Sequence, residues 1–174
     1  MPLDAGYIAL INCTNIVIKN LVLSNNIQGI RIAGSTGITI YNVTLINNCI
    51  GVYVGTPASP PWRLSKNNLV VNSLIANNTD AGIRLYAASN NTLYGNNILN
   101  NKNGIQLWIS SNNAFYHNNF INNTNQLYFH HGSWENIWDN GYPSGGNYWS
   151  DYNCTDLFSG PYQNETGSDG IGDT

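Results

Sequence analysis

The feature that most constrains the fold is a repeat in which an Asn-Asn pair precedes a glycine and a short run of alternating apolar residues. Gly29 and Gly51 hold the same place in successive copies and lie 22 residues apart, as do Gly82, Gly104 and Gln126 in later copies. The Ile-x-Ile alternation has the period of a β-strand, and Asn and Gly tolerate the left-handed backbone of tight corners. The repeat therefore predicts an all-β parallel solenoid whose coils stack about 4.8 Å apart.

About five such coils are expected in residues 1–132. Gly51 and Gly82 are 31 residues apart, so one coil carries about nine extra residues, and a proline-rich loop near residues 55–66 accounts for them. Residues 8–10 precede residues 30–32 by one repeat, so the chain begins in mid-coil. We expect upstream coils, a partner or end-to-end self-association at this end, because strand edges invite pairing.

Two kinds of residue column follow from the repeat. Four apolar columns are expected to fill the interior, starting at Ile18, Leu23, Ile30 and Ile32 and ending at Phe115, Phe120, Leu127 and Phe129. The first Asn of each pair is expected to form a buried amide ladder at one corner, comprising Asn25, Asn47, Asn77, Asn100 and Asn122.

Residues 133–174 form a second region, rich in Trp and Tyr and with an acidic, glycine-rich end. We interpret it as a cap that covers the last coil and its strand edges. The aromatic residues assigned to this cap are Trp134, Trp138, Tyr142, Tyr148, Trp149 and Tyr152.

Composition excludes several classes of protein. Charged residues make up 9% of the chain, and six Lys and Arg cannot form a phosphate-neutralising stripe, so no nucleic-acid partner is expected. No apolar run approaches the ~18 residues of a membrane span. Three cysteines without a CxxC motif exclude a dense disulfide scaffold and argue against a thiolate zinc site.

Two C-terminal motifs resemble a known family. Residues 136–152 read Asn-Ile-Trp-Asp-Asn-Gly-Tyr-Pro-Ser-Gly-Gly-Asn-Tyr-Trp-Ser-Asp-Tyr, and residues 167–174 read Gly-Ser-Asp-Gly-Ile-Gly-Asp-Thr. With the coils, they resemble the NosD-type right-handed parallel β-helix proteins of the pectin-lyase-like superfamily, and in particular archaeal cell-surface members. The resemblance implies secretion and an extracellular or cell-surface location. It also implies an excised piece, because relatives continue beyond Thr174 with Pro-Tyr.

The outer face beside the Ile-x-Ile strand is a candidate glycan-binding strip. Aromatic rings stack on sugar faces, and Arg side chains donate to hydroxyls and carboxylates. A purely structural ladder of like side chains is the alternative for this face. The candidate ligand-binding residues are Arg31, Tyr53, Arg84, Tyr86, Trp108 and Tyr128.

Calcium is the one cofactor expected, because hard oxygen ligands on a flexible loop suit this ion. Its candidate ligands are Asp151, Asp156, Asp169 and Asp173, with solvated acidic turns as the alternative. No copper is expected, although the family is named after a periplasmic copper-accessory protein. The adjacent His130 and His131 would point to opposite faces of a strand, His117 lies on another part of the coil, and the chain has no internal Met.

Seven Asn-x-Thr sequons are present. Asn90, Asn153 and Asn164 are the expected acceptors in a secreted chain. Asn77 and Asn122 are expected to be buried in the ladder and unmodified.

The expected function is a non-catalytic structural or adhesive role at the cell surface, with glycan binding on the outer strip. One alternative is a filament or surface-layer subunit that stacks end to end. The other is a truncated carbohydrate-active lyase or hydrolase whose catalytic coils lie elsewhere, because Asp80 has no carboxylate in register.

Overall fold

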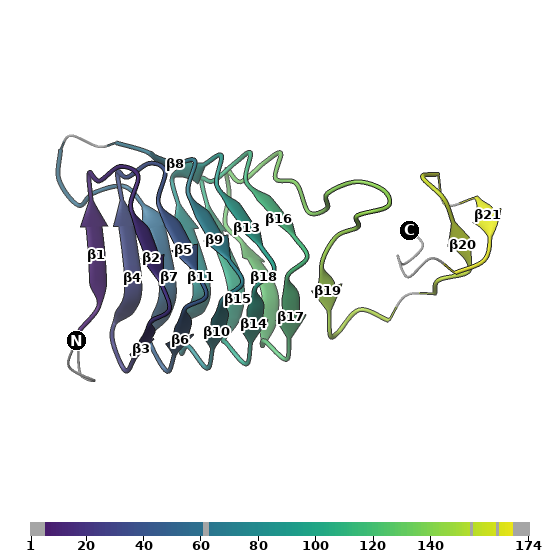
Figure 1. The fold of residues 1–174 in the computed structure, drawn as a ribbon, viewed down its shortest axis with the longest axis horizontal. Coiled ribbons are helices and arrows are strands. Elements are labelled where there is room, and N and C mark those ends of the chain that lie inside the picture. The colour runs from purple at the N-terminus through teal and green to yellow at the C-terminus, as the bar shows by residue number, and fades with distance from the viewer. Residues whose placement is uncertain (1–5, 61–62, 154, 163, 169–174) are drawn as a thin grey trace.

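The computed structural model describes residues 6–60, 63–153, 155–162 and 164–168. In this part of the chain the secondary structure is β-strand throughout, with no helix, and the strands stack as a parallel β-helix (Figure 1). The described residues accordingly contain no helix with the length and hydropathy of a membrane span. The all-β solenoid predicted from the repeat is confirmed.

The first sheet is formed by the Ile-x-Ile strands. Successive members pair in parallel, and the spacing between paired residues is one repeat, as in Ile8 with Ile30 and Ile83 with Ile105. Its six strands delimit five complete turns, which agrees with the prediction of about five coils. In spatial order they are β1 (Ile8–Ile11), β4 (Gln28–Ala33), β7 (Ile50–Gly55), β11 (Ala81–Tyr86), β15 (Asn103–Trp108) and β18 (Asn125–Phe129).

Two further parallel sheets complete each coil. The second sheet contains β2 (Val17–Lys19), β5 (Thr39–Tyr41), β9 (Leu69–Val71), β13 (Thr92–Tyr94) and β16 (Ala114–Tyr116). The third contains β3 (Val22–Ser24), β6 (Thr44–Ile46), β10 (Leu74–Ala76), β14 (Asn97–Leu99), β17 (Asn119–Ile121) and β19 (Tyr148–Trp149). A short parallel pair joins β8 (Ser65–Lys66) to β12 (Ala88–Ser89), and the tail has an antiparallel pair, β20 (Phe158–Ser159) and β21 (Glu165–Thr166).

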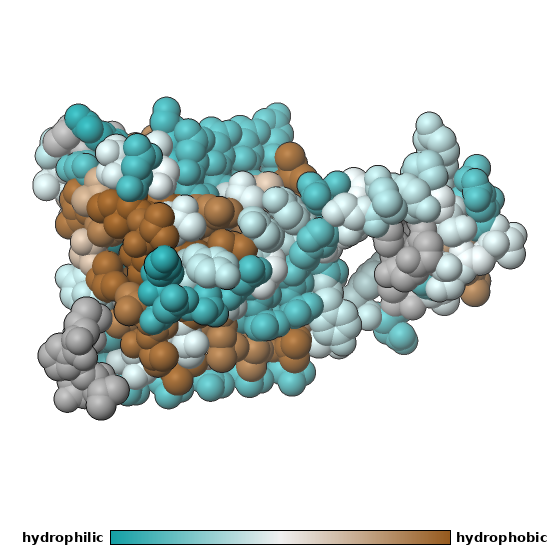
Figure 2. All heavy atoms as spheres, viewed as in Figure 1, coloured by the Kyte–Doolittle hydropathy of each residue, from teal (hydrophilic) through white to brown (hydrophobic). Residues whose placement is uncertain are grey.

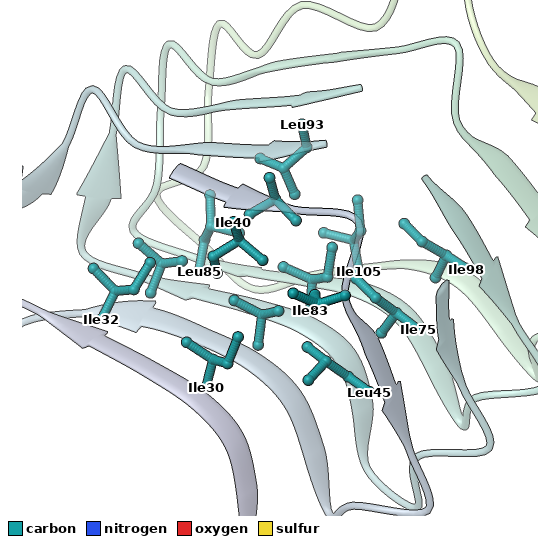
Figure 3. Packing of buried hydrophobic residues seen from close by; sticks show 14 of the residues in the cluster. Ile30, Ile32, Ile40, Leu45, Ile75, Ile83, Leu85, Leu93, Ile98 and Ile105 are labelled. Atoms are coloured by element: carbon teal, nitrogen blue, oxygen red, sulfur yellow. The ribbon is translucent and has the colours of Figure 1, made fainter. Parts of the chain in front are cut away.

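The interior is filled by the predicted apolar columns. Figure 3 shows Ile30, Ile32, Ile83 and Leu85 of the first sheet pointing toward side chains of the other two sheets, such as Ile75. These residues are fully buried, and they belong to one continuous cluster along the stack. Burial of the columns is less complete at the last coil than expected, because Phe129 is 52% exposed there.

The predicted amide ladder is displaced by one residue. Asn47 and Asn100 adopt φ values of 57° and 54° and are exposed, so the first Asn of each pair makes the left-handed corner itself. The second Asn points inward and forms the ladder, because neighbouring residues at the corner face opposite sides. In that ladder, Oδ1 of each Asn accepts the backbone N–H of the Asn one coil earlier, through Asn26, Asn48, Asn78, Asn101 and Asn123.

The C-terminal region begins as an aromatic cap. Trp138 stacks on Phe115, with ring centroids 4.5 Å apart, and Trp149 stacks on Phe120 at 4.3 Å. β19 also pairs with β17, which covers the end of the third sheet. Trp138 and Trp149 thus cover the last coil, whereas four of the six aromatic residues assigned to the cap are exposed to solvent, namely Trp134, Tyr142, Tyr148 and Tyr152.

Candidate functional site

The predicted ligand-binding residues lie in register on the outer face of the first sheet. Arg31 pairs with Tyr53, and Tyr53 pairs with Arg84. The column continues through Gln106 to Tyr128, which is 44% exposed. Since alternate residues of a strand point to opposite faces, the inward Ile residues place these side chains outside.

Arg31 contacts the aromatic ring of the next coil. Its Cζ lies 4.7 Å from the ring centroid of Tyr53, within the range of a cation–π contact. The guanidinium also donates to Oε1 of Gln28 at 3.5 Å. No carboxylate forms an ion pair with Arg31 among the residues that the structure describes. Its charge is therefore available to an anionic ligand.

Asp80, Arg84 and Gln106 form a hydrogen-bonded group on the same face. Arg84 donates to Asp80 in an ion pair, and its Nε donates to Oε1 of Gln106 at 2.6 Å. Gln106 Nε2 in turn donates to Oδ1 of Asp80 at 3.1 Å. The side chains of Arg84 and Asp80 remain 23% and 32% exposed. The group therefore holds Arg84 in one orientation and still presents it to solvent.

A second column runs beside the first. The rings of Tyr86 and Trp108 lie 6.1 Å apart, and Trp108 stacks on His130 at 3.9 Å with an interplanar angle of 19°. The Nε1–H of Trp108 is buried without a hydrogen-bond acceptor among the described residues. In this column Gly55 leaves room for the ring of Tyr53, whose Cε1 would lie 2.6 Å from a Cβ on the glycine. The two columns thus merge into one aromatic strip with two guanidinium groups.

Burial raises the pKa of the Tyr53 hydroxyl above its ordinary value of 10.0. The positive charges of Arg31 and Arg84 lower this pKa, whereas the nearby Tyr86 raises it. The effect of burial is the largest, so Tyr53 stays a neutral donor and acceptor at neutral pH.

The coils offer no pair of carboxylates for hydrolysis. Asp80 is the one Asp or Glu between residues 6 and 132, and it is ion-paired with Arg84. Hydrolysis of a glycosidic bond by the usual mechanism requires two carboxyl groups on opposite sides of that bond.

The predicted calcium ligands are only partly within the described residues. Asp169 and Asp173 lie outside them. Asp151 is exposed, and Asp156 accepts a hydrogen bond from Ser168 Oγ at 2.7 Å. No group of three or more His, Cys, Asp or Glu residues in the described chain is placed to hold a metal ion. Calcium binding stays a prediction from the sequence.

The predicted glycosylation sites Asn90, Asn153 and Asn164 are exposed. The expectation that Asn77 and Asn122 are buried is wrong, since both are exposed corner residues with φ values of 55° and 52°. Accessibility does not separate these five sequons, and their modification stays a prediction.

Sequence reasoning missed Asp80 as a member of the strip. The spacing of four between Asp80 and Arg84 was the available signal, because residues four apart along a strand share a face. His130, which lies 22 residues after Trp108, was already aligned with Trp108 by the repeat.

The comparisons with known proteins agree with this fold. The profile of a family described as "Periplasmic copper-binding protein (NosD)" matches residues 5–154. Among solved structures, the A-module of the mannuronan C-5 epimerase AlgE6 of Azotobacter vinelandii superposes with a TM-score of 0.53 at 15% identity. The alignment covers 67% of this chain but 35% of that module, so the chain spans about a third of its length. At this identity the likeness shows the fold alone. No curated protein matches the chain.

The described residues do not fit the copper site that the family description implies. His130 follows β18 and is stacked on Trp108. His117 follows β16 of another sheet, and its Nε2 lies 2.8 Å from the backbone oxygen of Ser144. Cys13 and Cys49 are free thiols on separate coils. Copper requires converging His, Cys or Met donors, and no such cluster occurs in the part of the chain that is described.

Proposed function

The chain belongs to the NosD family, and from this premise we propose that it acts outside the cytoplasm as a non-catalytic, adhesive β-helix protein that binds acidic polysaccharide. The periplasmic description of the family supports this location. The observation that carries the proposal is the register of Arg31, Tyr53 and Arg84 on one outer face. A surface location like that of the archaeal proteins mentioned above belongs to the same proposal.

The chemistry of the strip favours an anionic sugar chain. Two guanidinium groups share the face with one carboxylate, and Arg recognises carboxylates through paired N–H donors. The exposed rings of Tyr86 and Tyr128 offer apolar faces to sugar rings. A repeat of about 4.8 Å between coils presents these groups at regular intervals along an extended chain.

Affinity electrophoresis in gels that contain polygalacturonate or alginate tests this proposal, with dextran as the neutral comparison. We expect retardation by the two polyuronates and weaker retardation as salt rises. Arg31→Ala and Tyr128→Ala should each weaken binding by about tenfold, equivalent to about 1.4 kcal/mol.

Lys19→Ala is the matched control, since Lys19 is an exposed cation on the second sheet. It should leave binding unchanged. Circular dichroism would verify the fold of each variant. Failure of the wild type to bind either polyuronate, or equal loss in Lys19→Ala and Arg31→Ala, would refute the proposal.

End-to-end self-association is a second candidate function, favoured by the first coil. Among the described residues, β1, β2 and β3 are edge strands, each paired with a neighbouring strand on one side only. The inward residues Ile8 and Leu10 of β1 are only partly buried. Figure 2 shows an apolar area over these first coils and hydrophilic side chains along the edges of the stack. Light scattering across a wide concentration range should show growing mass in the wild type and a monomer in Leu10→Lys. A concentration-independent monomeric mass in the wild type would reject this candidate.

A further inference from the structure

A cleft of about 1240 Å³ lies at the C-terminal end of the stack, and the strip residues Arg31, Tyr53, Arg84, Tyr86, Trp108 and Tyr128 are not in its lining. Its lining comes from His117, Asn119 and residues 124–127 of the last coil, and from residues 138, 139, 144–149, 151 and 152 of the C-terminal region. Figure 1 shows this tail leaving the end of the stack beside β19. The cleft is therefore formed by the C-terminal motif together with the last coil.

The base of the cleft is anchored to the core. Trp138 and Trp149 line the cleft, and each indole ring stacks on a buried Phe of the last coil. Asn147 holds the loop by donating to the backbone oxygens of Phe115 at 2.9 Å and Trp138 at 2.8 Å. The cleft is thus preorganised, which lowers the entropy lost on binding.

The lining combines exposed rings with hydrogen-bonding groups. Tyr148 and Tyr152 line the cleft and are 58% and 61% exposed. Asn119, the strand partner of Tyr148, and Asn125 also line the cleft, and their amide nitrogens each donate to an Asn of the coil before, at 2.8 and 2.9 Å. These bonds fix both amide side chains. Apolar rings beside fixed amides match the apolar faces and the hydroxyl groups of a sugar.

Charge separates this cleft from the strip on the first sheet. Residues 133–174 contain seven of the nine Asp and Glu residues of the chain and no Lys or Arg. Asp139 and Asp151 line the cleft, and no cationic Lys or Arg lines it. Carboxylates accept hydrogen bonds from sugar hydroxyls but repel the carboxylates of uronic acids. The lining therefore selects an uncharged saccharide.

We propose that this cleft is a second binding site, which takes a neutral oligosaccharide and works independently of the strip. Tyr148 and Tyr152 provide the stacking surfaces, and Asn119, Asn125 and Asp151 bind the hydroxyl groups. The proposal rests on different residues from the proposed function, so either can fail without the other.

Isothermal titration calorimetry with neutral hexasaccharides of glucose, mannose, xylose and N-acetylglucosamine tests the site, with hexagalacturonate as the acidic comparison. At least one neutral ligand should bind the wild type, and Tyr148→Ala and Tyr152→Ala should weaken it by about tenfold. Tyr162→Ala is the matched control, because this ring is 84% exposed and lies outside the cleft. Trp108→Ala should leave neutral binding intact, since it removes a residue of the strip only.

Three outcomes would overturn the proposal. The first is that no neutral hexasaccharide binds the folded wild type. The second is that neutral binding is lost in Trp108→Ala and retained in both cleft variants, which would assign it to the strip. The third is that Tyr148→Ala abolishes self-association rather than sugar binding, which would make a second copy of the chain the occupant.

Discussion

The indole ring of Trp149 lies flat on the ring of Phe120, with centroids 4.3 Å apart and planes inclined by 7°. Phe120 is the last member of a fully buried column, so without Trp149 its outer face would meet water. A solenoid cannot cover its own last coil, and stacked repeats depend on terminal caps for this purpose. The contact therefore joins the tail to the repeat and closes the core.

Trp149→Ala should lower the free energy of unfolding by about 2–3 kcal/mol, because burial of a large apolar side chain contributes about that amount. Thermal and urea unfolding, followed by circular dichroism, would measure the loss. Trp134→Ala is the control, since Trp134 is 71% exposed and should change stability by less than about 0.5 kcal/mol. Equal effects of the two substitutions would contradict the assigned cap.

Replacement of a ladder amide should cost far more than replacement of the corner residue beside it. Asn101 accepts bonds at 2.9 Å from the backbone N–H and the Nδ2 of Asn78, and it donates to the oxygens of Ile75 and Asn123. Asn101→Ala leaves these buried groups without partners and should destabilise the protein by about 3 kcal/mol or more. Asn100→Gly keeps the left-handed corner and should cost less than about 1 kcal/mol. Urea titrations would measure the loss of stability in both variants. A larger loss in Asn100→Gly than in Asn101→Ala would be incompatible with the ladder.

The repeat glycines Gly29, Gly51, Gly82 and Gly104 are required for close approach between coils, because a Cβ on each would lie within 3 Å of a backbone oxygen of the next coil. A Cβ on Gly51 would lie 2.5 Å from the backbone oxygen of Gly82 and 2.8 Å from a methyl group of Ile75. Gly51→Ala should therefore destabilise the fold by about 1–3 kcal/mol through overpacking. Gly6→Ala is the control, because no atom lies within 4 Å of its added Cβ. A stability of Gly51→Ala equal to that of Gly6→Ala would mean that the coils separate easily.

The repeat made the solenoid and its apolar columns predictable, because a period-2 pattern that recurs every 22 residues leaves few other folds. The ladder was misplaced by one residue for a physical reason. Asn47 and Asn48 are chemically identical, and only the corner geometry decides which takes the positive φ and which points inward. A local sequence pattern does not contain that choice.

The site was predicted less completely than the fold. The outer columns followed from strand register, but the bonds among Asp80, Arg84 and Gln106 depend on side-chain rotamers and on a neighbouring coil. The C-terminal cleft had no periodic signal at all. Its walls are irregular loops held by specific contacts, such as those of Asn147 to the ends of the core.

Tyr53 should make the folded protein less stable as the pH rises above its ordinary pKa of 10.0. Burial raises this pKa in the folded state, so in that pH range the folded chain retains a proton that the unfolded chain has released. Stability then falls with increasing pH, because the folded state binds more protons than the unfolded state. Below the ordinary pKa both states hold the proton, and the hydroxyl makes no pH-dependent contribution. Unfolding free energies measured from neutral to strongly alkaline pH should therefore decline less steeply in Tyr53→Phe than in the wild type.

Arg31 provides the internal check on this assignment. Its positive charge opposes the effect of burial and lowers the pKa of Tyr53. Its removal in Arg31→Ala should raise that pKa further and steepen the alkaline decline in stability. The double variant with Tyr53→Phe should lose this extra slope, because the titrating group is absent. Ultraviolet difference titration between the wild type and Tyr53→Phe would follow the phenol directly. If the tyrosine ionises at or below its ordinary pKa in the folded protein, or if Arg31→Ala shifts it downward, the ring is not packed beneath the guanidinium as described.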